Sequence, residues 1–371
     1  MRPTTSAFLA ALLAAPVWSQ VQPPQPVSPD VRLDDGLGIH ELDADTQRAI
    51  EEGVQWLADA QHASGCWSSK PSNYRMSVTA LAGLALLAHG DTPDSGRYSG
   101  KVLRTVEWML KSQLREGPWA GLFFDGAYRD PTENLDEQQR KVAEDNRPMH
   151  GHGFALLFLA EAYGATRDER LRRRVHESIA MGCRLTERTM SPDGGWYYHP
   201  SSRRDEGSVT ITQIQGLRSA HNAGINVDEK VIKRAIEYIR ASQMEDGGIR
   251  YTRLWGKTSP ALTAAGVSVL HACGEYSSKT VERCYDYLRQ NLRTESEQHP
   301  FFFYTHLYAV QAMHQRGGPE WASYYPRIRR ELLDMRRGCP WWESQFGREY
   351  GTANALLILE VPLRYLPIYQ R

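Results

Sequence analysis

Helical stretches of this chain end repeatedly in turns that carry an aromatic residue, a glutamine, a glycine and a tryptophan at nearly constant spacing. In the first turn, Gln61 follows Trp56 by five residues and precedes Trp67 by six, with Gly65 two residues before that tryptophan. The same offsets recur, partly substituted, at positions that include Trp108, Gln113, Trp119, Trp196 and Gln243. A unit repeated every ~40–50 residues cannot bury its apolar face alone, so the pattern predicts a solenoid or a closed array.

The second helix expected in each repeat is apolar nearly all round. Residues 79–88, 153–160 and 262–270 consist mainly of Ala, Leu, Gly and other uncharged residues, whereas the preceding helices carry one charged face. A helix that is apolar on every side is surrounded by protein. The alternation therefore predicts an all-α fold, an α/α toroid in which an outer ring of helices encloses an inner ring.

About six helical pairs are expected along the chain. They fall near residues 45–90, 98–164, 168–224, 228–274, 278–317 and 321–366, with an insertion at about 122–147. An open superhelix is the structural alternative, but it would enclose the second helices less completely. In a closed ring the inner helices start at one rim, where their positive ends favour anionic groups above an apolar barrel.

The N-terminal segment has the layout of a secretory signal. Residues 1–19 begin with Met1 and Arg2, continue through an apolar run and end in a small residue at Ser19. We expect this signal peptide to be cleaved near Ser19 and the mature protein to be exported, periplasmic or extracellular. Residues 20–43 are expected to form a Pro-rich tether, and residues 44–371 a single toroid domain without a transmembrane helix.

Charge and cysteine content limit which binding partners and which disulfides can be expected. The 44 basic and 44 acidic side chains balance, so no nucleic-acid partner is expected. Five cysteines are too few for a disulfide framework. Cys273 and Cys284 flank one helix–helix turn. Two buried free thiols are the favoured interpretation, and a disulfide between them is the alternative.

The sequence resembles a known repeat family. Gly53-x-x-Trp56-Leu57-x-x-x-Gln61, followed by Gly65-x-Trp67, is similar to the QW motif of squalene and hopene cyclases. Over residues 45–366 the array resembles the prenyltransferase/squalene oxidase repeat proteins, and residues 150–161 and 350–371 resemble an exported, uncharacterised bacterial branch. The resemblance implies a terpenoid cyclase-like toroid, with its tryptophans and glutamines in structural roles.

The catalytic signatures of these relatives are missing from the sequence. Class II cyclases protonate an alkene with an acid in an Asp-x-Asp-Asp cluster, which this chain lacks. The zinc site of protein prenyltransferases needs Asp-x-Cys and a distant His; here the segment starting at Ser259 has neither ligand, and His306 matches the His only roughly. We therefore predict no metal and no cofactor, and whether the protein is an enzyme stays open.

A basic loop resembles the diphosphate-binding turn of the prenyltransferases. Two glycines are followed by Arg250, Arg253 and Lys257. These side chains are candidates for binding an anion at the rim, with a solvated basic loop as the alternative.

Polar residues at the starts of the expected inner helices are candidates for the cavity and its rim. They are His150, His152, Tyr304, His306, Tyr350 and Thr352. Two imidazoles two residues apart, as in the first pair, can share a metal or serve as base and acid, whereas capping and rim hydrogen bonds are commoner roles.

Three functions are compatible with the predicted toroid. The leading hypothesis is a central cavity that binds a hydrophobic, isoprenoid-like molecule, as a carrier or as an enzyme of altered chemistry. The second is a polysaccharide lyase or hydrolase, which needs an open groove lined by carboxylates, with Asp125 as one acid. The third is a scaffold that presents its surface to another exported protein and has a cavity plugged by its own side chains. The fold alone does not decide among them.

Overall fold

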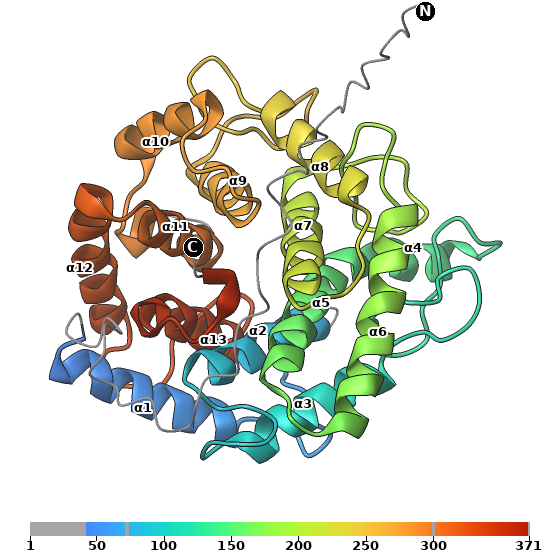
Figure 1. Cartoon of the computed structure of the whole chain (residues 1–371), viewed down its shortest axis with the longest axis horizontal. Helices are drawn as coiled ribbons and strands as arrows, with labels where there is room; N and C mark the ends of the chain where they lie inside the picture. Colours follow the sequence, from blue (N-terminus) through green and yellow to red (C-terminus); the bar gives the residue numbers. More distant parts are fainter. Residues whose placement is uncertain (1–41, 71–73, 299–300, 370–371) are drawn as a thin grey trace, which may run out of the picture.

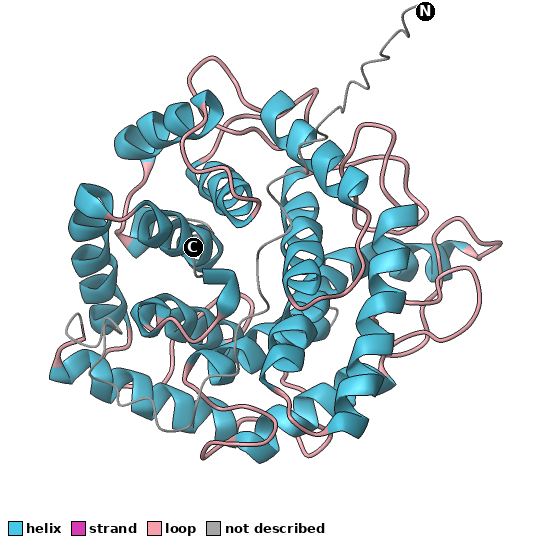
Figure 2. Cartoon of the chain, viewed as in Figure 1, coloured by secondary structure: helices cyan, strands magenta, loops and turns pink. Residues whose placement is uncertain are grey.

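The computed structural model describes residues 42–70, 74–298 and 301–369. The predicted signal peptide and all but the last two residues of the predicted tether lie outside the described residues. Within those ranges the chain forms helices and loops, and no strand longer than an isolated bridge is present (Figure 2).

Helices of the described chain form two concentric rings (Figure 1). The inner ring consists of α2 (Arg75–Ala88), α5 (Pro148–Ala165), α7 (Gly207–Asn222), α9 (Pro260–Ala272), α11 (Phe302–Arg316) and α13 (Arg348–Leu359). The outer ring consists of α1 (Ala44–Asp59), α3 (Ser99–Lys111), α6 (Glu169–Arg188), α8 (Glu229–Ala241), α10 (Lys279–Asn291) and α12 (Gly318–Met335). The predicted insertion contains α4 (Glu137–Asp145), which lies at the periphery in this view.

The ring is closed. Helix α13 packs against α2, and α12 contacts α1, so the last repeat meets the first in both rings. Nearly every residue of α2, from Met76 to Ala88, is buried, whereas α1 buries one face only. The α/α toroid predicted from the sequence is confirmed, and the open superhelix is excluded.

The two rings begin their helices differently. Four outer helices start at Asp43, Asp168, Asp228 and Ser278, whose side chains accept backbone N–H bonds. Among the inner helices, α2, α5, α11 and α13 have no side-chain cap, whereas α7 and α9 do. Backbone donors at the start of four inner helices are therefore not used by a capping side chain.

Glutamines of the repeat turns join successive outer helices. The Nε2 group of Gln61 donates to the carbonyls of Gly65 and of Lys101 on α3, at 3.2 and 2.9 Å. Gln113 and Gln243 make the same pair of contacts to their own turn and to the next outer helix, α6 and α10 respectively. Each amide satisfies two carbonyls that would otherwise lose their hydrogen bonds, which stabilises the ring.

Tryptophans of the repeat turns anchor each turn to its own outer helix. Trp67 and Trp196 are fully buried, and each donates Nε1–H to a carbonyl ten residues earlier, at 2.7 and 2.8 Å. Trp108 is buried on α3, and the half-buried Trp56 lies with its ring 5.7 Å from that of Trp341. These aromatic residues hold the helical pairs together rather than line a site.

The second repeat departs from the predicted equivalence. Gln113 donates to the carbonyl of Gly121, eight residues later, where the first repeat has a spacing of four. Phe123, two residues after that glycine, is fully buried, whereas Trp119 is only partly buried. Trp119 is therefore not the counterpart of Trp67, because four extra residues lengthen the turn and pass the buried position to Phe123.

One end of the barrel is closed by polar side chains and the C-terminal segment. Gln311 accepts hydrogen bonds from Gln215 and Ser268, at 2.9 and 2.8 Å, and Gln315 donates to the Ile368 carbonyl at 3.4 Å. The short helices η5 (Val361–Leu363) and η6 (Pro367–Tyr369) lie against this end, where η6 contacts α7 and α11.

Cys273 and Cys284 are free thiols in the structure. Burial raises the pKa of Cys273 to about 11 and that of Cys284 to about 12. In the described part of the chain, no helix combines the length and apolarity needed to cross a bilayer.

Candidate functional site

A cavity of about 690 Å³ opens at the end of the barrel where the inner helices begin. Its wall includes Ser77 and Val78 of α2, His150 of α5, Ser208 of α7 and Ala261 of α9. Because the parallel inner helices all start at this end, their first turns converge on one space. The cavity therefore lies at the rim that the repeat pattern indicated.

Aromatic side chains dominate the cavity wall. They are Tyr74, Phe154, Tyr198, Tyr251, Phe301, Tyr304, Phe346 and Tyr350. No Asp or Glu occurs among the described residues that line the cavity. A pocket of this composition binds apolar molecules and carries a few polar groups that fix their orientation.

Three cations lie at the mouth of the cavity. Arg147, Lys257 and Arg293 line the pocket and are exposed to solvent. The guanidinium of Arg147 lies 4.6 Å from the ring centre of Tyr198, a cation–π contact that orients both side chains. The mouth is therefore positively charged above an apolar interior.

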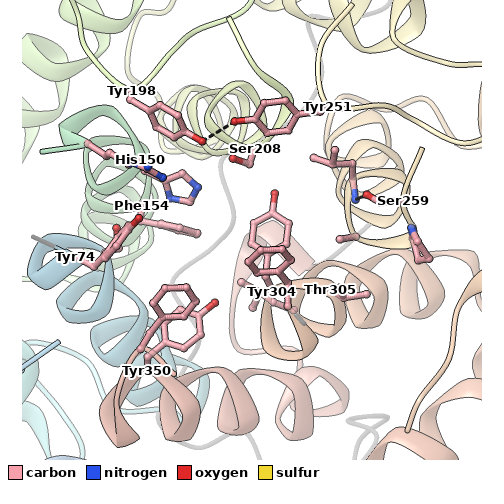
Figure 3. A pocket seen from close by; sticks show the side chains of 18 of the residues that line it. Tyr74, His150, Phe154, Tyr198, Ser208, Tyr251, Ser259, Tyr304, Thr305 and Tyr350 are labelled. Atoms are coloured by element: carbon pink, nitrogen blue, oxygen red, sulfur yellow. Dashed lines mark hydrogen bonds between the residues drawn. The ribbon is translucent and has the colours of Figure 1, made fainter. Parts of the chain in front are cut away.

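Of the six predicted cavity residues, the structure brings three to the cavity. His150, Tyr304 and Tyr350 line it, and Figure 3 shows their side chains around the same space. His152, His306 and Thr352 lie outside the cavity and are fully buried. Each excluded residue follows a lining residue by two positions, which places the two side chains on different faces of the helix.

The excluded residues join the inner helices to the outer layer. Thr352 Oγ1 accepts a hydrogen bond from the Trp342 backbone N–H at 3.1 Å. His152 Nδ1 occupies the equivalent place in the second repeat and accepts from the Phe123 N–H at 3.3 Å. Burial lowers the pKa of His152 to about 3, so its imidazole is neutral and serves as an acceptor here.

His306 contacts the outer ring in a similar way. Its Nδ1 lies 2.8 Å from the hydroxyl of Tyr324 on α12. The contact is buried between α11 and α12, away from the cavity. The sequence placed His306 correctly at a helix start but not on the correct face.

His150 faces the cavity as a neutral ring. Burial, followed by the positive charge of Arg147, lowers the pKa of His150 to about 4. Its ring centre lies 5.5 Å from that of Phe154, on the next turn of α5. The imidazole therefore adds to the aromatic wall and offers a neutral donor or acceptor, not a charge.

The three basic residues of the predicted anion-binding loop have different surroundings. Arg253 pairs with Asp193 at 2.5 Å, and the Arg250 guanidinium donates to the Arg253 carbonyl. Neither arginine lines the cavity, whereas Lys257 does. Two of the three candidate anion ligands are thus engaged by groups of the chain itself.

Two tyrosines that were not among the six predicted cavity residues, Tyr198 and Tyr251, lie opposite Tyr304 in the cavity. Tyr198 follows the buried anchor Trp196 by two residues, and Tyr251 follows the equivalent anchor Ile249 by two. Their hydroxyls are 2.7 Å apart (Figure 3). The common offset from the two anchors was the signal that could have identified them.

A second, smaller cavity of about 190 Å³ adjoins Arg147. It is lined by Arg75 and Asp125, which form an ion pair at 2.5 Å. Asp125, the acid predicted for a carbohydrate-active enzyme, lies in this side cavity rather than in the large one. No group of three His, Cys, Asp or Glu side chains suited to a metal ion occurs among the described residues.

The fold and the cavity together define an all-α toroid of the squalene-cyclase type, with a pocket at the start of the inner helices. No protein-family model matches the chain. The chain is 24% identical to a probable squalene–hopene cyclase of Sinorhizobium fredii over 306 residues, 71% of this chain and 43% of that protein. It is 22% identical to a squalene–hopene cyclase of Bradyrhizobium diazoefficiens, over 67% of this chain and 40% of that protein. The chain thus spans less than half the length of these curated relatives.

Solved structures show the same architecture. A type II terpene cyclase from Scytonema superposes with a TM-score of 0.58 at 16% identity, over 87% of this chain and 99% of that one. A variant of that cyclase has been solved with geranylgeranyl dihydroxybenzoate, its substrate. An α-1,6-mannanase from Salegentibacter sp. superposes with a TM-score of 0.62 at 7% identity, over 86% of this chain and 99% of that one. At these identities the similarities establish the fold alone.

Proposed function

We propose that this protein binds a hydrophobic, isoprenoid-like molecule in the cavity at the start of the inner helices. The observation that carries the proposal is the aromatic wall, which has no carboxylate among the described lining residues. Its volume of about 690 Å³ falls in the range of small-molecule sites. The similarity to a terpene cyclase solved with a geranylgeranyl compound supports this class of ligand.

The energetics favour a hydrocarbon body. Burial contributes about 0.8 kcal/mol per CH₂, so a five-carbon isoprene unit gains about 4 kcal/mol before the costs of ordering are subtracted. The exposed cations Lys257 and Arg293 at the mouth leave room for a polar or anionic head group near solvent. A molecule with one polar end and an apolar tail matches both parts of the site.

We propose binding, or a chemistry other than class II cyclisation, as the use of this cavity. Class II cyclisation starts with a strong carboxylic acid next to the alkene. The chain has no Asp-x-Asp-Asp cluster, and the described lining residues offer no carboxyl group. The neutral His150 is not a substitute, because an imidazole is far too weak an acid to protonate an alkene.

The carbohydrate alternative fits the cavity less well. Glycoside hydrolysis uses two carboxyl groups about 5–9.5 Å apart across the scissile bond. Asp125 is paired with Arg75 in the side cavity, and no second carboxylate lines either cavity among the described residues. The likeness to a mannanase supports the toroid only.

We further propose that the protein acts after export, with an exported protein as a candidate partner. The support is the signal-like sequence of residues 1–19. Intact mass measurement of the protein secreted from its producing cell should show cleavage near Ser19. Retention of that segment by the mature protein would overturn the export proposal.

Isothermal titration with prenyl alcohols of ten, fifteen and twenty carbons tests the binding proposal. We expect the dissociation constant to fall about tenfold or more per added isoprene unit until the cavity is full. Ala261→Trp, which fills the cavity from the first turn of α9, should abolish binding, whereas Ala241→Trp on the exposed end of α8 should not. Absence of binding, or equal binding by the Ala261→Trp variant, would refute the proposal. Binding of an α-1,6-mannooligosaccharide in place of the alcohols would favour the carbohydrate alternative.

A further inference from the structure

A layer of polar side chains crosses the barrel beneath the cavity. Gln215 of α7, Ser268 of α9 and Gln311 of α11 are buried, and they lie outside the cavity wall. The side-chain oxygen of Gln311 lies 2.9 Å from the Gln215 amide nitrogen and 2.8 Å from the Ser268 hydroxyl. In the inner ring α9 stands between α7 and α11 and packs against both. The contact between the two glutamines therefore crosses the interior of the barrel.

Helix geometry places this layer deeper than the cavity. Ser208, Ala261 and Tyr304 line the cavity, and the three polar residues follow them by seven positions on the same helices. Seven residues make almost two helical turns, so the two members of each pair share one face and lie about 10 Å apart along the axis. Because the inner helices start at the mouth, the later member of each pair is the deeper one.

The polar layer also has support from below. The Gln311 amide donates to the Leu307 carbonyl at 2.7 Å, and Gln315, one turn farther on, donates to the Ile368 carbonyl of η6 at 3.4 Å. Helix η6 contacts both α7 and α11. An apolar tail that entered the layer would separate groups that are hydrogen-bonded to one another, and buried polar groups without partners are costly. A bound tail is therefore expected to end above Gln311.

Leu307 stands between the cavity and the polar layer. Of the inner-helix residues that line the cavity, Phe154 and Leu307 lie farthest along their helices. Leu307 is buried and precedes Gln311 by four residues, about one turn of α11. Its side chain therefore forms part of the deep end of the cavity, opposite the mouth where Lys257 lies.

The volume of the cavity determines how much tail it can enclose. A carbon atom with its hydrogens takes up about 30 Å³, similar to a water molecule in the liquid. A cavity of about 690 Å³ then encloses about 20 such groups, the size of four isoprene units. With the polar end of the ligand at the mouth, a fifteen-carbon tail stops short of the deep end. A fifth isoprene unit has no room and stays outside.

We propose that Leu307, supported by the layer of Gln215, Ser268 and Gln311, limits the enclosed tail to about four isoprene units. The inference rests on the proposed function and adds the length class of its ligand. An isoprenoid longer than this gains no further burial in the cavity. Leu307 is thus the residue that determines specificity for tail length.

Prenyl alcohols of fifteen, twenty and twenty-five carbons test this limit. Farnesol, geranylgeraniol and geranylfarnesol are titrated by calorimetry against the full chain and against variants of Leu307. The affinities are compared between proteins for one alcohol at a time, which cancels the different solubilities of the three alcohols. Farnesol does not reach the deep end, so its binding also reports whether a variant has kept its cavity.

Two substitutions should move the limit in opposite directions. Leu307→Ala removes three carbons from the deep end, so geranylfarnesol should bind about tenfold more tightly than it binds the wild type. Leu307→Phe fills the deep end and should weaken geranylgeraniol about tenfold. Neither variant should change the affinity for farnesol. Leu217→Ala, at a buried leucine of α7 outside the cavity wall, is the control and should change none of the three affinities.

The outcomes separate the two proposals. Unchanged affinities for geranylfarnesol in Leu307→Ala and for geranylgeraniol in Leu307→Phe overturn the length limit and leave the isoprenoid cavity in place. Loss of farnesol binding in both variants also overturns it, since the shorter tail would then depend on Leu307. Absence of binding of all three alcohols to the wild-type protein overturns the proposed function and this inference together.

Discussion

Glu161 provides a test of the energetics at the closed end of the barrel. It lies on α5, is buried, and accepts a hydrogen bond from the Ser219 hydroxyl on α7. Burial raises its pKa from 4.5 to about 7, and the Ser219 hydrogen bond only partly opposes this. The folded protein therefore holds a proton on Glu161 at pH values where the unfolded chain has released it.

The sign and size of the effect follow from linkage. Where the folded state binds more protons than the unfolded state, the free energy of unfolding falls as the pH rises. The contribution of Glu161 is fully present below about pH 4.5 and is lost as the pH rises through about 7. Between pH 5 and pH 8 the loss amounts to about 2.5 kcal/mol.

Glu161→Gln removes this loss, because the amide is neutral at every pH and still offers an oxygen to Ser219. Urea unfolding at pH 5 and pH 8 should show the variant gaining about 2.5 kcal/mol on the wild type between the two values. Taking the difference between the two proteins cancels the other titrating groups, such as His150. Glu177→Gln, which removes an exposed carboxylate of α6, controls for the change in net charge. A difference in unfolding free energy between variant and wild type that stays constant with pH would refute the burial argument.

Three further predictions concern the repeat turns and the thiols. Gly121→Ala should destabilise the fold by about 2 kcal/mol or more, because φ is +103° and the new Cβ would lie 2.4 Å from a carbonyl oxygen. Gly164→Ala, on the open side of α5, should instead stabilise by about 0.5–1 kcal/mol in urea unfolding, and equal effects would contradict the strain argument. Gln61→Leu should cost about 1–3 kcal/mol by the same assay, since two buried carbonyls lose their donor; a neutral variant would contradict this. Cys183 and Cys284, with pKa values raised to about 12 by burial, should resist iodoacetamide until urea unfolds the chain, and rapid labelling of the native protein would show that they are accessible.

The repeats, and the division into amphipathic outer helices and apolar inner helices, were predictable from the sequence because both depend on local residue patterns. The apolar second helices, such as residues 79–88, can be stable only inside a ring, and the structure places them there. The position of the cavity followed from the same pattern, since parallel inner helices begin at one end. The predicted equivalence of Trp119 and Trp67 was wrong. The extra residues of the second turn leave the spacing of glycine and tryptophan unchanged, so they could not be recognised from that spacing.

The lining of the cavity was only partly predictable. His150 and His152 were both predicted to lie at the cavity, although side chains two residues apart on a helix point to different faces. Tyr198 and Tyr251 lie in loops, and their convergence depends on how two separate repeats pack.

Diffraction from crystals of the protein grown with geranylgeraniol would show whether the cavity binds an isoprenoid alcohol. We predict density for one molecule in the cavity, among the first turns of the six inner helices. An empty cavity at saturating alcohol, or alcohol bound on the outer ring instead, would contradict the proposed function.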